Sequence, residues 1–232
     1  MQAEMTRQMI ANFNDPAAVA QYTEGPVRFV PGYTELHRMT AILLGERAPA
    51  NARVLVLGAG GGMELKALAE AHVRWTFEGV DPAGEMLKLA ERTLGSLAPR
   101  VELREGYIED ASEGPFDAAA CLLTLHFLDR GTRVRTAAEI RRRLKPGAPF
   151  VAAHSSFPQD EASRPQWLSR YAAYAVAAGA DPEMAEKARA GVAAHLDLLT
   201  PEEDEAVLRE AGFSDVAMFY AAFTWRGWVA YA

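Results

Sequence analysis

Short apolar runs alternate with longer amphipathic segments through the middle of the chain. The pattern predicts strands near residues 53–57, 75–80, 100–104, 116–122 and 148–154. Helices are expected between them, at about 62–72, 83–95 and 130–144. This alternation is typical of an α/β fold, a doubly wound and mostly parallel sheet with helices on both faces.

The C-terminal part has a different pattern. Thr200-Pro201-Glu202-Glu203 supplies a capping hydroxyl, a proline in the first turn and a glutamate at the third position, which predicts a helix start. This helix should end at Gly212, and two β-rich stretches, 214–221 and 223–231, are spaced for an antiparallel hairpin. We therefore expect seven strands, the last two in a hairpin.

Two helical stretches lie outside this core and are expected to cover a ligand site as lids. We interpret the chain as one domain, 1–232, with four parts. These are an N-terminal helical lid (1–47), the sheet core (48–155), an alanine-rich helical insertion (156–199), and the C-terminal helix and hairpin (200–232).

Composition narrows the class of protein. Half of the 232 residues are hydrophobic and 24% are charged, which is an ordinary globular balance. The net charge of −7 argues against non-specific nucleic-acid binding. A single cysteine, Cys121, excludes an internal disulfide and a multi-thiolate zinc site, and we expect no metal. We find no membrane-spanning stretch or signal-peptide core, so we expect a cytoplasmic protein without membrane association; a homodimer stays an open alternative.

The segment Val54-Leu55-Val56-Leu57-Gly58-Ala59-Gly60-Gly61-Gly62 carries the clearest chemical signal. A buried strand that runs into glycines and then a helix lets a ligand approach bare backbone and unpaired helix N–H groups. Asp81 follows at the end of the next strand, where a carboxylate can bind both hydroxyls of a ribose. The two features together predict a nucleoside pocket with an unphosphorylated ribose.

The glycine spacing is G-x-G-x-G, and Met63 stands where a dinucleotide fold has its third glycine. This spacing resembles motif I of the class I S-adenosyl-L-methionine (SAM) methyltransferases. Three further segments are similar to that family in order and spacing: FEGVDPAGEMLKLAE (77–91), VELREGYIED (101–110) and FDAAACLLTLHFL (116–128) followed by RLKPG (143–147). The resemblance implies a Rossmann-like fold and SAM as the cofactor.

A finer likeness is to the carboxy-SAM synthases and their methyltransferase relatives, through VRFVPGY (27–33), LTLHFL and LLTPEEDEAVLREAGF. It implies that Gly58 to Gly60 hold the methionine end of SAM, that Asp81 holds the ribose, and that Tyr107 and Ile108 border the adenine. The full set of expected cofactor residues is Tyr33, Gly58, Ala59, Gly60, Gly62, Asp81, Pro82, Met86, Tyr107 and Ile108.

The chain departs from these relatives at several positions. Val56 stands where many of them carry an acidic residue, and Tyr107 replaces an aspartate on the adenine side. Leu122 replaces an asparagine of the synthases, and Arg189 is displaced by about two positions from the arginine that pairs with the extra carboxylate. These departures argue against carboxy-SAM as the ligand.

Methyl transfer needs a base only if the acceptor loses a proton. His126 and His154 follow or end predicted strands on the ligand side and are the candidates, with helix capping or packing as the alternative. Arg28 and Arg189 are candidates for binding an anionic substrate, although lone arginines are mostly solvated. The aromatic residues at 167, 171 and 174 share a helix face, for which packing is the default interpretation.

Three functions remain open. The favoured one is a SAM-dependent methyltransferase that acts on a small molecule. The alternatives are a carboxy-SAM synthase-like enzyme, and a non-catalytic SAM-binding protein suggested by Val56 and the absence of an unmistakable base.

Overall fold

The computed structural model describes residues 11, 13–16, 19, 22 and 25–232. Its strands are β1 (Arg53–Leu57), β2 (Thr76–Asp81), β3 (Val101–Glu105), β4 (Ala118–Leu122), β5 (Pro149–Ser155), β6 (Ser214–Ala222) and β7 (Trp225–Tyr231). Its helices are α3 (Gly25–Phe29), α4 (Tyr33–Gly45), α5 (Met63–Ala71), α6 (Gly84–Leu94), α7 (Arg130–Arg142), α8 (Ser163–Ala177), α9 (Pro182–His195) and α10 (Pro201–Glu210). Short 3-10 turns are η2 (Gly95–Arg100), η3 (Ile108–Asp110) and η4 (Leu125–Phe127).

All seven strands join one sheet in the order β3-β2-β1-β4-β5-β7-β6. The first five are parallel, and β7 pairs antiparallel with both β5 and β6. The expected fold class is therefore confirmed, with strand bounds that differ from the expected ones by a residue or two. Strands β2 and β3 extend the sheet on one side of β1, and β4 and β5 extend it on the other. This switch point makes the crevice at the carboxyl ends of β1 and β4 a natural ligand site.

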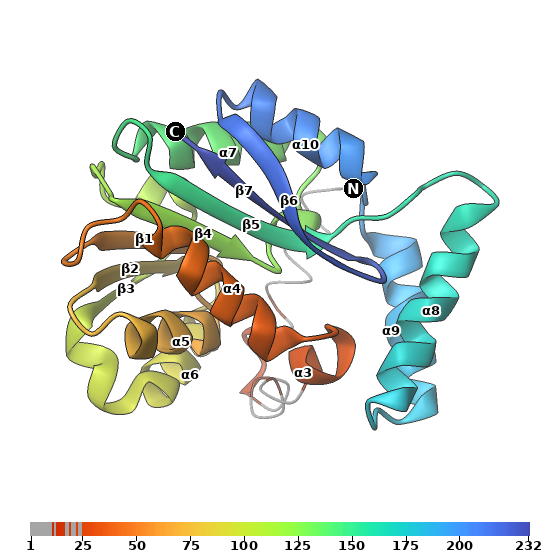
Figure 1. Ribbon diagram of the computed structural model, residues 1–232. Coiled ribbons are helices and arrows are strands. Elements are labelled where there is room, and N and C mark those ends of the chain that lie inside the picture. Colours follow the sequence, from red (N-terminus) through yellow and green to blue (C-terminus); the bar gives the residue numbers. More distant parts are fainter. Residues whose placement is uncertain (1–10, 12, 17–18, 20–21, 23–24) are drawn as a thin grey trace.

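Helices cover both faces of the sheet (Figure 1). Leu36 of α4, Leu65 of α5 and Leu94 of α6 pack in one apolar cluster against one face. Ile140 of α7 and Leu208 of α10 belong to the cluster on the opposite face. Strands β4 and β5 are buried along their whole length, because side chains on each of their faces pack under one of these layers.

Helices α8 and α9 form a hairpin that projects beyond the sheet (Figure 1). Tyr171 of α8 packs on Phe29 of α3 at 5.3 Å between ring centroids, and Tyr174 packs on Phe223 at 5.9 Å. The aromatic face expected in this insertion therefore serves packing. No helix within the described residues combines the length and apolarity needed to span a bilayer.

Candidate functional site

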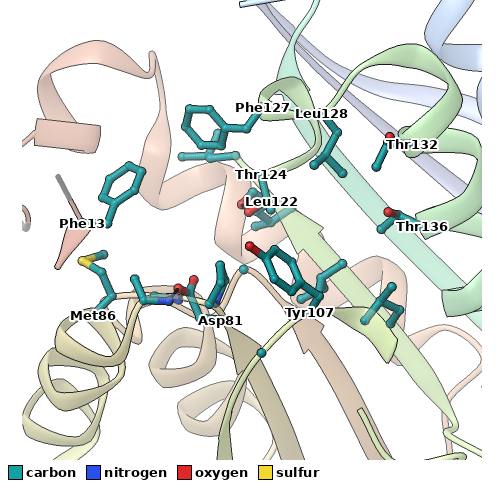
Figure 2. A pocket seen from close by; sticks show the side chains of 18 of the residues that line it. Phe13, Asp81, Met86, Tyr107, Leu122, Thr124, Phe127, Leu128, Thr132 and Thr136 are labelled. Atoms are coloured by element: carbon teal, nitrogen blue, oxygen red, sulfur yellow. Dashed lines mark hydrogen bonds between the residues drawn. The ribbon is translucent and has the colours of Figure 1, made fainter. Parts of the chain in front are cut away.

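A cavity of about 520 Å³ opens at the carboxyl ends of β1, β2 and β4. Its walls come from the glycine loop after β1, the ends of β2 and β3, and the segment after β4 (Figure 2). Among the residues expected to bind a cofactor, those that line it are Gly58, Gly60, Asp81, Pro82, Met86, Tyr107 and Ile108. Segments separated by fifty residues in the sequence thus meet at one site, as the parallel topology requires.

The glycine loop is crowded against its neighbours. A Cβ atom at Gly58, whose φ is 77°, would lie 1.9 Å from Oγ1 of Thr124. One at Gly60 would lie 2.8 Å from Oδ2 of Asp81. A side chain therefore does not fit at either position, which leaves the backbone bare where both residues line the cavity.

Gly62 and Ala59 have other roles. Gly62 precedes α5 with a φ of 73°, and a Cβ there would lie 2.7 Å from Cα of Ala90 on α6. Ala59 is 2% exposed and belongs to the apolar core. Neither lines the cavity, because both are taken up by packing against neighbouring elements.

Asp81 is held by backbone donors at the floor of the cavity. Its Oδ2 accepts a hydrogen bond from the N–H of Gly60 at 3.0 Å, and its Oδ1 accepts one from Ala83 at 2.9 Å. Burial raises the pKa of this carboxyl group, while the two backbone donors oppose the rise. The carboxylate is thus fixed in place and retains free lone pairs for a further donor.

The opposite wall consists of the segment after β4 and the first turns of α7. Figure 2 shows Phe127, Leu128 and Thr132 facing Asp81 and Tyr107 across the cavity. Leu123 adopts a φ of 55°, which is rare for leucine, and its N–H donates to Ala153 at 2.6 Å. The motif LLTLHFL (122–128) marks this wall in the sequence. Only His126 was selected from it as a site residue, and the residues of the motif that line the cavity were missed.

The expectation that His126 lies at the mouth of the cavity is wrong. The 3-10 turn η4 directs the imidazole away from the cavity, so that it is 5% exposed and packs edge-on against Trp225. Its Nδ1 accepts from the N–H of Ser155 at 3.5 Å. Burial, followed by the nearby His154 and Arg133, holds its pKa well below the usual range.

His154 does not line the cavity either. Its Nε2 lies 3.0 Å from Oδ1 of Asp204 on α10, whose other partner is the guanidinium of Arg133 on α7 at 2.8 Å. Burial tends to raise the pKa of Asp204, but His154 and Arg133 outweigh it and leave that pKa below its usual value. These side chains form a buried polar connection between the sheet and the two helices on its second face.

The remaining candidates lie elsewhere. Tyr33 is 8% exposed at the start of α4 and packs against His37, with ring centroids 4.4 Å apart. Arg189 on α9 donates to Glu186 at 2.8 Å, and Arg28 lies on α3. None of these three lines the cavity, and no described lining residue comes from α8 or α9. The insertion was expected to cover the site, but it packs beside α3 instead. From the N-terminal part, Phe13 and Tyr22 do line the cavity.

Three further features concern the cysteine, potential metal ligands and the N-terminal segment. Cys121 is buried in β4, and burial raises the pKa of its thiol well above the usual value. No cluster of three or more potential metal ligands occurs in the part of the chain that the structure describes. Part of the expected N-terminal lid, residues 1–10, 12, 17–18, 20–21 and 23–24, lies outside the described residues.

Comparison with known proteins gives a consistent result. Residues 54–147 match a family described as a methyltransferase domain. A carboxy-S-adenosyl-L-methionine synthase of Chromohalobacter salexigens is 28% identical over 231 residues, covering 96% of this chain and 84% of that protein. A ubiquinone biosynthesis O-methyltransferase of Xanthomonas axonopodis is 31% identical over 169 residues, covering 71% of this chain and 63% of that protein.

Solved structures share the fold. The magnesium protoporphyrin IX methyltransferase of Synechocystis, solved with bound SAH, superposes with a TM-score of 0.68 at 14% identity. The match covers 98% of this chain and 99% of that one. The two proteins therefore share the arrangement of the sheet and its helices.

Proposed function

Since the chain belongs to the class I SAM-dependent methyltransferase superfamily, we propose that it transfers the methyl group of SAM to a small-molecule acceptor bound in the cavity after β4. One observation carries this proposal. The bare backbone of Gly58 and Gly60 and the fixed carboxylate of Asp81 line one cavity of about 520 Å³. The residues present thus suit a nucleoside with a free ribose diol.

Each wall has a role in this proposal. The carboxylate of Asp81 accepts hydrogen bonds from the ribose hydroxyls, while Met86 and Ile108 supply apolar surface for a planar base. When bound, SAM supplies a methyl group that is already activated by its positive sulfur. The protein therefore has to orient the acceptor and exclude water, for which positioning contributes about 7–11 kcal/mol.

The acceptor side is aromatic. Phe13 packs edge-on against both Tyr22 and Phe127, with ring centroids 6.0 Å apart in each pair. All three line the cavity, and no histidine occurs among its described lining residues. This wall favours an acceptor with apolar surface whose methylation does not depend on an imidazole base.

The first test is calorimetric. We predict that Asp81→Ala weakens SAM binding at least tenfold, because hydrogen bonds to a charged group contribute about 1.5–3 kcal/mol each. Glu105→Ala is the matched control, since Glu105 ends the neighbouring strand β3, is exposed and does not line the cavity. An equal affinity of wild-type protein and Asp81→Ala for SAM would contradict the proposed site.

Turnover of labelled SAM with a panel of small acceptors then separates an enzyme from a protein that only binds SAM. The carboxy-SAM synthase alternative is favoured by the 28% identity along 96% of the chain. Incubation with SAM and prephenate distinguishes it, because only that reaction adds the mass of a carboxyl group to the cofactor. The pairing of Arg189 with Glu186 away from the cavity argues against it.

A further inference from the structure

Glu64 is a buried acidic side chain that the proposed function has not used. It lies in the first turn of α5, directly after the glycine loop, and is only 8% exposed. Its Oε1 is buried and has no hydrogen-bond partner among the described residues. A buried carboxylate without a full set of partners is costly, so Glu64 has room for a partner beyond those that the described residues provide.

The position of Glu64 is next to the cavity. The backbone N–H of Leu122 donates to its carboxylate, and Leu122 is the last residue of β4 and a lining residue of the cavity. Tyr22, another lining residue, interacts electrostatically with both Glu64 and Asp81. Glu64 therefore lies at the crevice between β1 and β4, where the strand order reverses.

Strand order also fixes the direction in which a bound nucleoside extends. Asp81 ends β2 on one side of β1, and Leu122 ends β4 on the other side. A ligand whose ribose lies at Asp81 and whose other end crosses the glycine loop after β1 therefore extends toward Leu122, which neighbours Glu64. In SAM, the group at that other end is a methionyl moiety with a cationic amine.

We propose that Glu64 binds the ammonium group of the methionyl moiety of SAM and replaces, from α5, the acidic residue that relatives carry on β1 at the position of Val56. This inference rests on the proposed function, because it requires that Asp81 binds the ribose. Val56 is fully buried and packs in the same apolar cluster as Leu65 of α5. The first turn of α5 is thus a neighbouring place from which a carboxylate can reach the same end of the crevice.

The electrostatics agree with this geometry. Burial raises the pKa of Glu64 to about 8, against the opposing effect of the Leu122 donor. The titratable groups that face it are Tyr22, Tyr33 and Cys121, which are all uncharged at neutral pH because burial raises their pKa values. A bound cation would therefore supply the missing charge and favour ionised Glu64.

The test compares two ligands. S-adenosylhomocysteine (SAH) carries the amino-acid group, whereas 5′-methylthioadenosine shares the adenosine part and lacks that group. We expect Glu64→Gln to bind SAH ten- to a hundredfold more weakly in calorimetry and to bind 5′-methylthioadenosine within twofold of the wild-type affinity. Glu70→Gln, an exposed position on the same helix, should change neither affinity.

Proton release gives a second readout. SAH binding at pH 7 should release a proton from Glu64, so that the binding enthalpy varies with the ionisation enthalpy of the buffer. This dependence should disappear in Glu64→Gln and should be smaller for 5′-methylthioadenosine. Any release from Asp81 would be common to both ligands, because both carry the ribose.

The outcomes separate the two proposals. Unchanged SAH affinity in Glu64→Gln, or equal losses for both ligands, would overturn the role of Glu64 while leaving the proposed function intact if Asp81→Ala still weakens both. A large fall in the melting temperature of unliganded Glu64→Gln would indicate a structural role and would also overturn it. If the wild-type protein binds neither ligand, the proposed function fails, and the role of Glu64 fails with it.

Discussion

Gly58 lies so close to Thr124 that a single added methyl group cannot be accommodated without movement of the chain. Its backbone is in the left-handed region, with a φ of 77°, and its N–H donates to the carbonyl of Val80 at 2.8 Å. The hydroxyl of Thr124 donates a hydrogen bond to the carbonyl oxygen of Leu122 at 2.9 Å, and this bond would break if the side chain rotated away. Both residues line the cavity, and no side chain fits at Gly58 beside Thr124.

We predict that Gly58→Ala destabilises the protein through two effects. Left-handed backbone costs an alanine about 1–2 kcal/mol, and the overlap with Thr124 adds about 1–3 kcal/mol. Gly147→Ala is the matched control, because Gly147 has a φ of 73° with no atom near its Cβ position and should show the first effect alone. Urea unfolding measures both; equal losses in the two variants would show that Thr124 yields without cost.

Among the elements, helix α10 connects helix α7 and strand β5 on the second face of the sheet, through Asp204. Thr200 and Glu203 form a reciprocal capping box at its start, with the N–H of Thr200 donating to Glu203 at 2.8 Å. The helix carries Asp204, which binds Arg133, and the Nε of Arg133 donates to the carbonyl of Leu128 at 2.9 Å. Because Leu128 lines the cavity, the start of α10 is linked to the cavity wall.

Loss of the cap should therefore lower the melting temperature of the whole protein. Thr200→Ala removes the hydroxyl that accepts from Glu203, which should cost about 1 kcal/mol. For a chain of this size we expect a melting temperature lower by about 2–4 °C. Thr200→Ser keeps the acceptor and should melt close to the wild-type temperature. If serine and alanine variants melt alike, the hydroxyl is not what stabilises this helix start.

At the scale of the whole molecule, burial of histidines makes stability depend on pH. His37 of α4 is 6% exposed, and burial lowers its pKa from the usual 6.5 to about 4. The unfolded chain therefore binds a proton below about pH 6.5 that the folded protein does not take up until about pH 4. Stability is present above pH 6.5 and is lost progressively between these two values.

His37→Gln should reduce this loss. The wild-type free energy of unfolding should fall between pH 7 and pH 4, with a contribution from His37 on the order of 3 kcal/mol. Buried His126 contributes in the same direction, since its pKa is also lowered. Urea unfolding at pH 7 and pH 4 measures this fall, and His195→Gln, at an exposed position on α9, should leave it unchanged. An unaltered pH dependence in His37→Gln would contradict the prediction.

Features that depend on neighbours along the chain followed from the amino-acid sequence. Hydrophobic periodicity predicts the strands and places Asp81 at a strand end. Contacts within one turn predict the cap at Thr200. The need for left-handed or bare backbone predicts the loop glycines Gly58 and Gly60. Parallel topology then brought Asp81 to the glycine loop, because the carboxyl ends of parallel strands meet at one edge.

Other features were decided by which distant segments pack together. A rotation within one 3-10 turn directs His126 toward Trp225 instead of the cavity. His154 lies against Asp204, fifty residues later, and Glu64 meets the end of β4 across the crevice. The order of elements and the glycines that leave the backbone bare could thus be predicted from local patterns. Which polar side chains face the cavity could not, because their direction depends on packing between segments that are remote in the chain.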